Sequence, residues 1–134
     1  MSTMLAVDDE PDILQALAAY LEATVPGLRV VTASSGLAGL EELAKGAPDI
    51  VLSDYRMPGM SGLEFLSQVA QRHPEVPCLL MTAYADSELA MRAVHEAHVR
   101  QFLTKPVDPT RLSTVVKELL GAEPIAKAGD AGEG

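Results

Sequence analysis

The fold of this chain is decided by the stretch Val51-Leu52-Ser53-Asp54-Tyr55-Arg56-Met57-Pro58-Gly59. A short run of branched apolar residues is typical of a buried strand, and the Pro and Gly that follow predict a loop. We therefore expect Asp54 at the end of a strand, where open parallel sheets bind their ligands. An Asp in such a loop can also serve only as a local hydrogen-bond partner for the backbone, and this stretch by itself leaves that alternative open.

Three other apolar runs end in polar residues in the same way: Leu5-Ala6-Val7 before Asp8-Asp9, Cys78-Leu79-Leu80-Met81 before Thr82-Ala83, and Gln101-Phe102-Leu103-Thr104 before Lys105-Pro106. If these strands are parallel neighbours, three carboxylates, a hydroxyl and an ammonium meet at one edge of the sheet. Carboxylates within a few ångströms repel one another, so a bound divalent cation is their natural compensation. Because these ligands are all oxygens, the pattern favours Mg²⁺.

Apolar residues at helical spacing fill the segments between the strands. They predict helices from Pro11 to Pro26, from Gly36 to Gly46, from Ser61 to Pro74, over about 86–97, and from Asp108 to Gly121. Residues 28–33 alternate and branch like a further strand. Strands that alternate with helices require right-handed crossovers and a parallel sheet covered on both faces. The sequence therefore predicts an α/β fold.

The same spacing predicts which helix residues face the core. In the first two helices these are Ile13, Leu14, Leu17, Ala18 and Leu21, followed by Leu37, Leu40, Leu43 and Ala44. Gly39 lies inside the second helix, where it should cost about 1 kcal/mol relative to Ala. Ser61 and Glu64 have the spacing of a capping box. The helix over 86–97 has a core face made largely of alanines, so it should shift easily.

Composition limits the class of protein. The 134 residues, 48% of them hydrophobic, fit one compact domain. The net charge of −9 argues against direct nucleic-acid binding by this domain. No apolar run approaches the roughly 20 residues that span a bilayer, and the chain starts without a signal-like segment, so we expect a cytoplasmic protein. Cys78 is the only cysteine, which excludes an internal disulfide and indicates a buried, inert thiol.

The acidic pair, the Asp, the Thr and the Lys-Pro occur in an order and spacing that resembles the receiver domains of two-component response regulators. The resemblance covers about residues 3 to 120. It implies a flavodoxin-like, doubly wound parallel sheet of five strands in the order 2-1-3-4-5, within a receiver domain of residues 1–120. Residues 121–134 are rich in Gly and Ala, and we expect a flexible tail or the start of an interdomain linker there.

The resemblance also implies a function. Asp54 would accept a phosphoryl group from a sensor histidine kinase or a histidine phosphotransfer protein, with Mg²⁺ bound. Such a domain is a regulatory phosphoacceptor rather than an enzyme with turnover, although it catalyses its own phosphoryl transfer and slow dephosphorylation. Its signal would pass through the surface of helix 4, strand 5 and helix 5 to a downstream effector or an attached output domain, and a homodimer on phosphorylation is possible.

Site residues follow from the resemblance position by position. Asp9 and Asp54 would bind Mg²⁺ directly, with the backbone carbonyl of Arg56, and Asp8 would act through water. The other roles are a phosphoryl-binding set of Thr82, Ala83 and Lys105, a switch pair of Thr82 and Phe102, and a pair that slows dephosphorylation, Arg56 and Tyr84. A cis bond before Pro106 would aim the Lys105 ammonium inward, as in similar proteins.

The chain departs from the family pattern at two positions. His98 stands where receivers commonly have a helix-ending Gly, and His tolerates the left-handed conformation better than most residues. Val107 replaces the Phe that usually follows Lys-Pro, which should matter little. His95 and His98 are three residues apart, but no acidic or sulfur partner near them supports a metal site.

Three other functions compete with this interpretation. A phosphatase of the dehalogenase-like class would need a second Asp two positions after Asp54, where this chain has Arg56. A nucleotide-binding module is disfavoured because neither 36–39 nor 59–62 fits a phosphate-binding glycine motif. A receiver used only as an unphosphorylated interaction module would not require Thr82 or Lys105.

Overall fold

The computed structural model describes residues 1–83 and 87–121. Its strands are β1 (Ser2–Val7), β2 (Leu28–Ala33), β3 (Ile50–Asp54), β4 (Cys78–Thr82) and β5 (Val99–Thr104). Its helices are α1 (Pro11–Thr24), α2 (Gly36–Lys45), α3 (Gly62–Arg72), α4 (Ser87–Ala97) and α5 (Pro109–Gly121). Tyr84 and residues 122–134 of the predicted tail lie outside the described residues.

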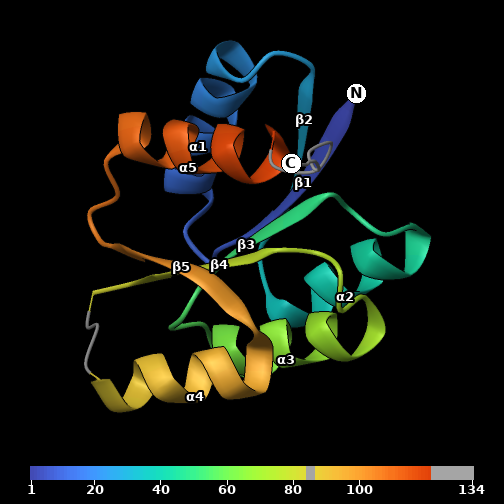
Figure 1. Cartoon of the computed structure of the whole chain (residues 1–134), viewed down its shortest axis with the longest axis vertical. Helices are drawn as coiled ribbons and strands as arrows, with labels where there is room; N and C mark the ends of the chain where they lie inside the picture. Colours follow the sequence, from blue (N-terminus) through green and yellow to red (C-terminus); the bar gives the residue numbers. More distant parts are fainter. Residues whose placement is uncertain (84–86, 122–134) are drawn as a thin grey trace, which may run out of the picture.

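The five strands form one parallel sheet in the order β2-β1-β3-β4-β5, as predicted. Figure 1 shows α1 and α5 on one face of the sheet and α2, α3 and α4 on the other. β3 is central and pairs with β1 on one side and with β4 on the other, with Val7 opposite Ser53 and Asp54 opposite Met81. Residues that follow β1, β3 and β4 therefore meet at the same edge.

The alternation of side chains along each strand divides the core into two layers. Leu5, Val51 and Leu80 pack with the face covered by α2, α3 and α4, around the fully buried Phe65. Alternate residues, such as Leu52, pack with the face covered by α1 and α5. A strand that is buried on both faces holds its backbone rigidly, so the sheet fixes the direction of the polar residues at its carboxyl edge.

The helix ends follow the predicted capping chemistry. Ser61 and Glu64 form a complete capping box at the start of α3, because each side chain accepts a hydrogen bond from the other residue's backbone N–H. At the start of α5, the Asp108 side chain accepts a hydrogen bond from the N–H of Thr110 at 3.0 Å. His98 follows α4 with φ 53°, the left-handed conformation expected for it.

Several predicted core positions of the first two helices are wrong. Ile13 on α1 is 44% exposed and Leu37 on α2 is 68% exposed, and Ala44 is exposed as well. The buried face of α2 consists of Gly36, Gly39 and Leu43. The helix is rotated toward its glycines because they allow it to approach the sheet more closely than the leucines would.

Gly39 has a packing reason that its helix propensity conceals. A Cβ atom added at this position would lie 2.8 Å from Cε1 of Phe65 and 3.1 Å from Cγ2 of Val7. Both neighbours are fully buried. The conformational cost of a glycine in α2 is therefore offset by the packing of the Phe65 ring beneath it.

Cys78 is a buried free thiol at the start of β4, as predicted. Burial raises its pKa to about 12, against a smaller opposing effect from Arg100, so the thiol stays protonated and unreactive at neutral pH. In the part of the chain that the structure describes, no helix is long and apolar enough to cross a membrane.

Candidate functional site

Three carboxylates converge at the carboxyl ends of β1 and β3. Asp54 is the last residue of β3, and Asp8 and Asp9 follow β1 directly. One carboxylate oxygen from each of the three lies within 4.8 Å of the others. The parallel pairing of β1 with β3 produces this cluster, because it continues the register that sets Val7 opposite Ser53.

Asp8 is the most deeply buried of the three, with no exposed surface. Its Oδ1 accepts a hydrogen bond from the N–H of Glu10 at 3.1 Å. Its Oδ2 is buried and has no hydrogen-bond partner among the described residues. Burial raises the pKa of Asp8 to about 6; the Glu10 N–H opposes this rise, the charge of Asp54 adds to it, and the charge of Lys105 opposes it.

Lys105 is the cation that faces these carboxylates. Its Nζ lies 3.2 Å from Oδ2 of Asp54, 3.6 Å from Oδ2 of Asp8 and 3.4 Å from Oε1 of Glu10. Burial alone would lower the pKa of Lys105, but the hydrogen bond and charge of Asp54, then Asp8 and Glu10, raise it above its ordinary value. The side chain is 21% exposed and remains charged at neutral pH. The peptide bond that follows it is cis, as expected.

The backbone also fixes Lys105 and Thr82 beside each other. Thr82 ends β4 opposite Thr104 of β5, and the N–H of Lys105 donates a hydrogen bond to the carbonyl of Thr82 at 3.0 Å. The Thr82 side chain is 2% exposed. A pocket of about 330 Å³ joins these groups, and it is lined by Asp9, Glu10, Asp54, Arg56, Thr82, Ala83 and Lys105.

The structure therefore brings together most of the residues singled out from the sequence. Phe102 lies apart from the pocket, on β5 opposite Leu80, where it is partly buried and packs against the core layer on the α2, α3 and α4 side. Arg56 is exposed at the rim of the pocket. Tyr84 lies outside the described residues, so the structure does not place it.

Two residues of the site were not predicted from the sequence. Glu10 contacts Lys105 although 95 residues separate them. The signal in the sequence that could have indicated this contact is that Glu10 follows Asp8 and Asp9 as a third acidic residue after β1. Gly62 packs against the backbone of Asp54, where a Cβ atom would lie 2.8 Å from the carbonyl carbon. Gly62 also donates a hydrogen bond to the carbonyl of Tyr55 at 2.8 Å. The first turn of α3 thus packs directly against the end of β3, which carries Asp54.

The donor set suits a hard divalent cation. Carboxylate oxygens are the ligands that Mg²⁺ prefers, and it binds through a few of them while it keeps several waters. The buried Oδ2 of Asp8, which accepts no hydrogen bond from the residues that the structure describes, is the kind of atom that a bound ion or its water would satisfy. The acidic cluster thus fits Mg²⁺ by chemistry and by spacing.

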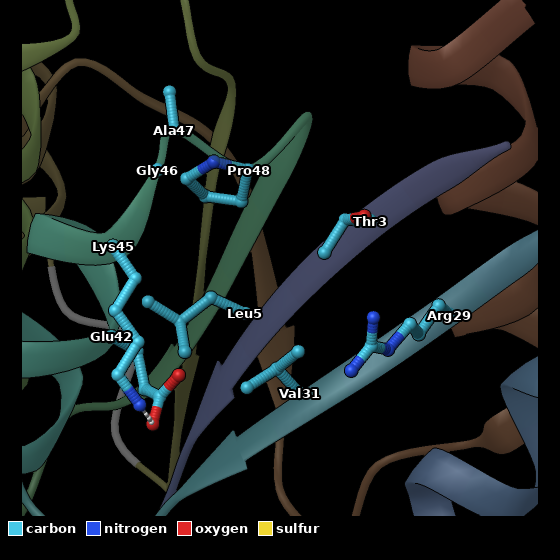
Figure 2. A pocket seen from close by; sticks show the side chains of 9 residues that line it. All are labelled: Thr3, Leu5, Arg29, Val31, Glu42, Lys45, Gly46, Ala47 and Pro48. Carbon is cyan, nitrogen blue, oxygen red and sulfur yellow. Dashed lines mark hydrogen bonds and ion pairs between the residues drawn. The ribbon is translucent and has the colours of Figure 1, made fainter.

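A second pocket, of about 320 Å³, lies away from the acidic cluster. Figure 2 shows Arg29 reaching toward it from β2 and Lys45 with Glu42 from the end of α2. Lys45 is already paired with Glu42 at 3.0 Å. The strand residues that line this pocket include Thr3, near the start of β1, whereas ligands of parallel sheets bind at the carboxyl ends of the strands. We assign this pocket no part in the chemistry.

Residues 4–117 match the family description of the response regulator receiver domain. The chain is 42% identical over 102 residues to the DNA-binding transcriptional regulator NtrC of Escherichia coli (strain K12), an alignment that covers 76% of this chain and 21% of NtrC. The chain thus spans about a fifth of the length of this relative.

Solved structures agree with the sequence comparison. A response regulator receiver domain protein from Clostridium thermocellum has a TM-score of 0.81 and 30% identity, and the alignment covers 90% of this chain and 95% of that one. A CheY-like receiver domain protein from Methanospirillum hungatei has a TM-score of 0.83 and 27% identity, over 90% of this chain and 94% of that one. With the strand order and the matched residues, these results show that the chain belongs to the response regulator receiver domain family.

Proposed function

We propose that Asp54 accepts a phosphoryl group from a phosphohistidine in a Mg²⁺-dependent reaction, and that the acyl phosphate switches the domain between two signalling states. The observation that supports this most directly is the position of the Asp54 carboxylate. It is 4% exposed, lines the pocket that also contains Thr82 and Ala83, and lies 3.2 Å from the Lys105 ammonium. The rigid central strand β3 holds the Asp54 carboxylate so that it points into this pocket.

In the proposed transfer, a carboxylate oxygen of Asp54 forms a bond to phosphorus while the bond between phosphorus and the donor nitrogen breaks. The imidazole leaves with the bonding electron pair and takes up a proton. Most of the catalysis in such a reaction comes from positioning and from electrostatic stabilisation of the phosphoryl oxygens. A Mg²⁺ held directly by Asp9, Asp54 and the Arg56 carbonyl, and through water by Asp8, would neutralise part of the charge on those oxygens.

The remaining pocket residues are assigned to the phosphoryl group. Lys105 would exchange its contact with Asp54 for an ion pair with one phosphoryl oxygen. The Thr82 hydroxyl and the Ala83 N–H would donate hydrogen bonds to another. Arg56, at the rim, offers only donors, so it would not orient a water for attack on the acyl phosphate. Together with Tyr84 it should lengthen the life of the phosphorylated state.

The proposed switch couples Thr82 to Phe102 and α4. Thr82 lies on β4 two residues beyond Leu80, which is opposite the partly buried Phe102, so a movement of its hydroxyl toward the phosphoryl group would leave room on the same side of the strand as Leu80. Among the α4 side chains that the structure describes, those of Ala93 and Ala97 are fully buried on the core side. Small side chains bury little apolar area, so a shift of this helix should cost little free energy. The surface of α4, β5 and α5 would then carry the signal to an effector, or support a dimer.

An apolar pocket beside the site supports a protein as the phosphoryl donor. It measures about 470 Å³, and it is lined by Glu10, Ile13, Leu17, Met81, Lys105, Pro106 and Val107. Ile13 is 44% exposed there, next to the residues that bind the phosphoryl group in our proposal. A small phosphodonor would not need this surface. A histidine kinase or phosphotransfer protein would, because it must dock on this chain before its histidine can reach Asp54.

The relatives indicate how the phosphorylated state would be used. NtrC is a DNA-binding transcriptional regulator, so the domain proposed here would act on an attached output domain or on a separate effector. The acidic balance of this chain, with a net charge of −9, makes it an unsuitable DNA contact in its own right.

Labelling with acetyl phosphate tests the proposal. We expect a phosphorylated species on an acyl-phosphate-sensitive gel only when Mg²⁺ is present, and none from Asp54→Asn. Glu41→Gln, at an exposed position on α2, is the matched control and should behave like the parent. Labelling of Asp54→Asn at the parent level would refute the assignment. Ile13→Ala should slow transfer from a phosphorylated histidine protein and leave acetyl phosphate labelling unchanged.

A further inference from the structure

Glu10 is a third carboxylate partner of Lys105 and stands outside the acidic cluster. Its Oε1 lies 3.4 Å from Nζ of Lys105, and its side chain is 55% exposed. Among the residues that the structure describes, the cluster that fits a metal consists of Asp8, Asp9 and Asp54. Lys105 thus lies between the carboxylates that would hold the metal and one carboxylate, that of Glu10, that would not.

The geometry around Lys105 creates a conflict when a cation binds. Its ammonium lies 3.2 Å from Asp54 and 3.6 Å from Asp8, so it neutralises the same oxygens that a divalent ion needs. Two cations that share a carboxylate repel each other. For the metal to bind, the ammonium must move away from the cluster without losing its own counter-ion.

Glu10 is placed to receive the displaced ammonium. It precedes α1 as its N-cap residue, and its side chain makes no capping hydrogen bond. Its backbone is fixed instead, because its N–H donates to Oδ1 of Asp8. The side chain therefore remains at the rim of the pocket with its carboxylate available to Lys105.

We propose that Glu10 is a positioning residue that holds the Lys105 ammonium at the rim while Mg²⁺ binds to the cluster, and so strengthens metal binding. This inference rests on the proposed function, since it concerns the same metal. Without Glu10, Lys105 would remain on Asp54 and Asp8 and compete with the ion. The effect should appear in metal affinity, before any phosphoryl group is present.

Calorimetric titration of the full chain with Mg²⁺ alone tests the proposal. Glu10→Gln should weaken Mg²⁺ binding by about threefold to fivefold, the size expected for one partly exposed ion pair. Asp12→Asn removes the same charge from an exposed position in the first turn of α1 and is the matched control. It should change the affinity by less than about 1.5-fold, because Asp12 is not among the carboxylates that pair with Lys105 and an exposed charge is screened. Equal weakening by both variants would show that only overall charge matters and would overturn the proposal.

Repeating the titration in a Lys105→Met variant shows whether Glu10 acts by holding the ammonium away from the metal or by attracting the metal itself. In Lys105→Met there is no ammonium to position, so adding Glu10→Gln should have no larger effect than the Asp12→Asn control. An undiminished loss in that background would overturn the proposal, because Glu10 would then act on the ion itself. The proposed function fails separately: it fails if the parent chain does not bind Mg²⁺ at all, whereas parent binding that is insensitive to Glu10 refutes only this inference.

Discussion

Replacing Asp8 with Asn should stabilise the metal-free protein at neutral pH. Asp8 has no exposed surface, and burial raises its pKa from 3.8 to about 6. A raised pKa means that the folded state holds the proton more tightly than the unfolded state does. At pH 7 the protein must therefore bury a charge that the unfolded chain leaves in water. Asn has nearly the same shape and removes that charge.

The size of the effect follows from the pKa. A rise of about two units corresponds to about 3 kcal/mol if the whole shift acts on stability. The pKa already includes the charge of Lys105, but solvent in the adjoining pocket screens a further part, so we expect about 1–2 kcal/mol in practice. For a chain of 134 residues this raises Tm by about 3–10 °C. The amide also keeps a donor and an acceptor for its neighbours, which limits any loss of hydrogen bonding.

The sign of the pH dependence is fixed by the direction of the shift. The contribution of Asp8 to stability is fully present below pH 3.8, its unfolded value, and is lost as the pH rises through about 6. The difference between Asp8→Asn and the parent should therefore be small near pH 4 and reach its full size by about pH 7. Other carboxylates titrate in the same range, but they are common to both proteins and cancel in the difference.

Urea unfolding in EDTA at several pH values between 4 and 7.5 measures this difference. Asp12→Asn, which changes an exposed acid by the same substitution, should stay within about 0.5 kcal/mol of the parent throughout. If Asp8→Asn is less stable than the parent at pH 7.5 without metal, the ionised carboxylate must be well compensated, and the reasoning from burial is wrong. Saturating Mg²⁺ should shrink the advantage of the variant, since the loss of Asp8, which would act on the ion through water, weakens its metal binding relative to the parent.

Two further predictions concern the packing of α2 and the rim of the site. Gly39→Ala should destabilise the protein by about 1–3 kcal/mol in urea unfolding, although Ala is the better helix former, because its Cβ would overlap the Phe65 ring; a neutral or stabilising result would mean that α2 moves outward freely. Arg56→Asn combined with Tyr84→Glu should shorten the life of the acyl phosphate about tenfold, or about 1.4 kcal/mol of barrier, because both new side chains can orient a water; unchanged phosphate release would leave the two residues without a role in timing.

Local patterns predicted the strands and the edge of the sheet well. Each strand of a doubly wound sheet is buried on both faces, so it appears in the sequence as a short apolar run with a sharp polar end. Asp54 and Thr82 are the last residues of their strands for this reason. Parallel pairing then places these ends together, whatever the lengths of the intervening helices. The convergence of the site was therefore predictable without any knowledge of side-chain contacts.

The errors have a different physical origin. The apolar spacing of α2 suggested a face with Leu37, but the helix packs through Gly36 and Gly39, whose small size is useful only against a particular partner ring. A periodicity argument considers only how hydrophobic the residues are, so it does not detect a helix that packs closely against its neighbours through glycines. Ile13 was misplaced because an exposed apolar residue that lines a surface pocket has the same spacing as a buried one. Glu10 was missed because its importance depends on a contact across 95 residues.

The charges of the site set an order for the proposed reaction. The site contains four acidic side chains, Asp8, Asp9, Glu10 and Asp54, and two cationic ones, Lys105 and Arg56. Its formal net charge is therefore −2. A phosphodonor with two negative charges would be repelled by this pocket, and a divalent cation would be attracted. One bound Mg²⁺ neutralises the pocket. The cation should therefore bind first and the donor second. Labelling rates at low Mg²⁺ should then follow the fraction of metal-bound protein. Added salt should reduce the affinity for Mg²⁺ more than it reduces the labelling rate at saturating Mg²⁺.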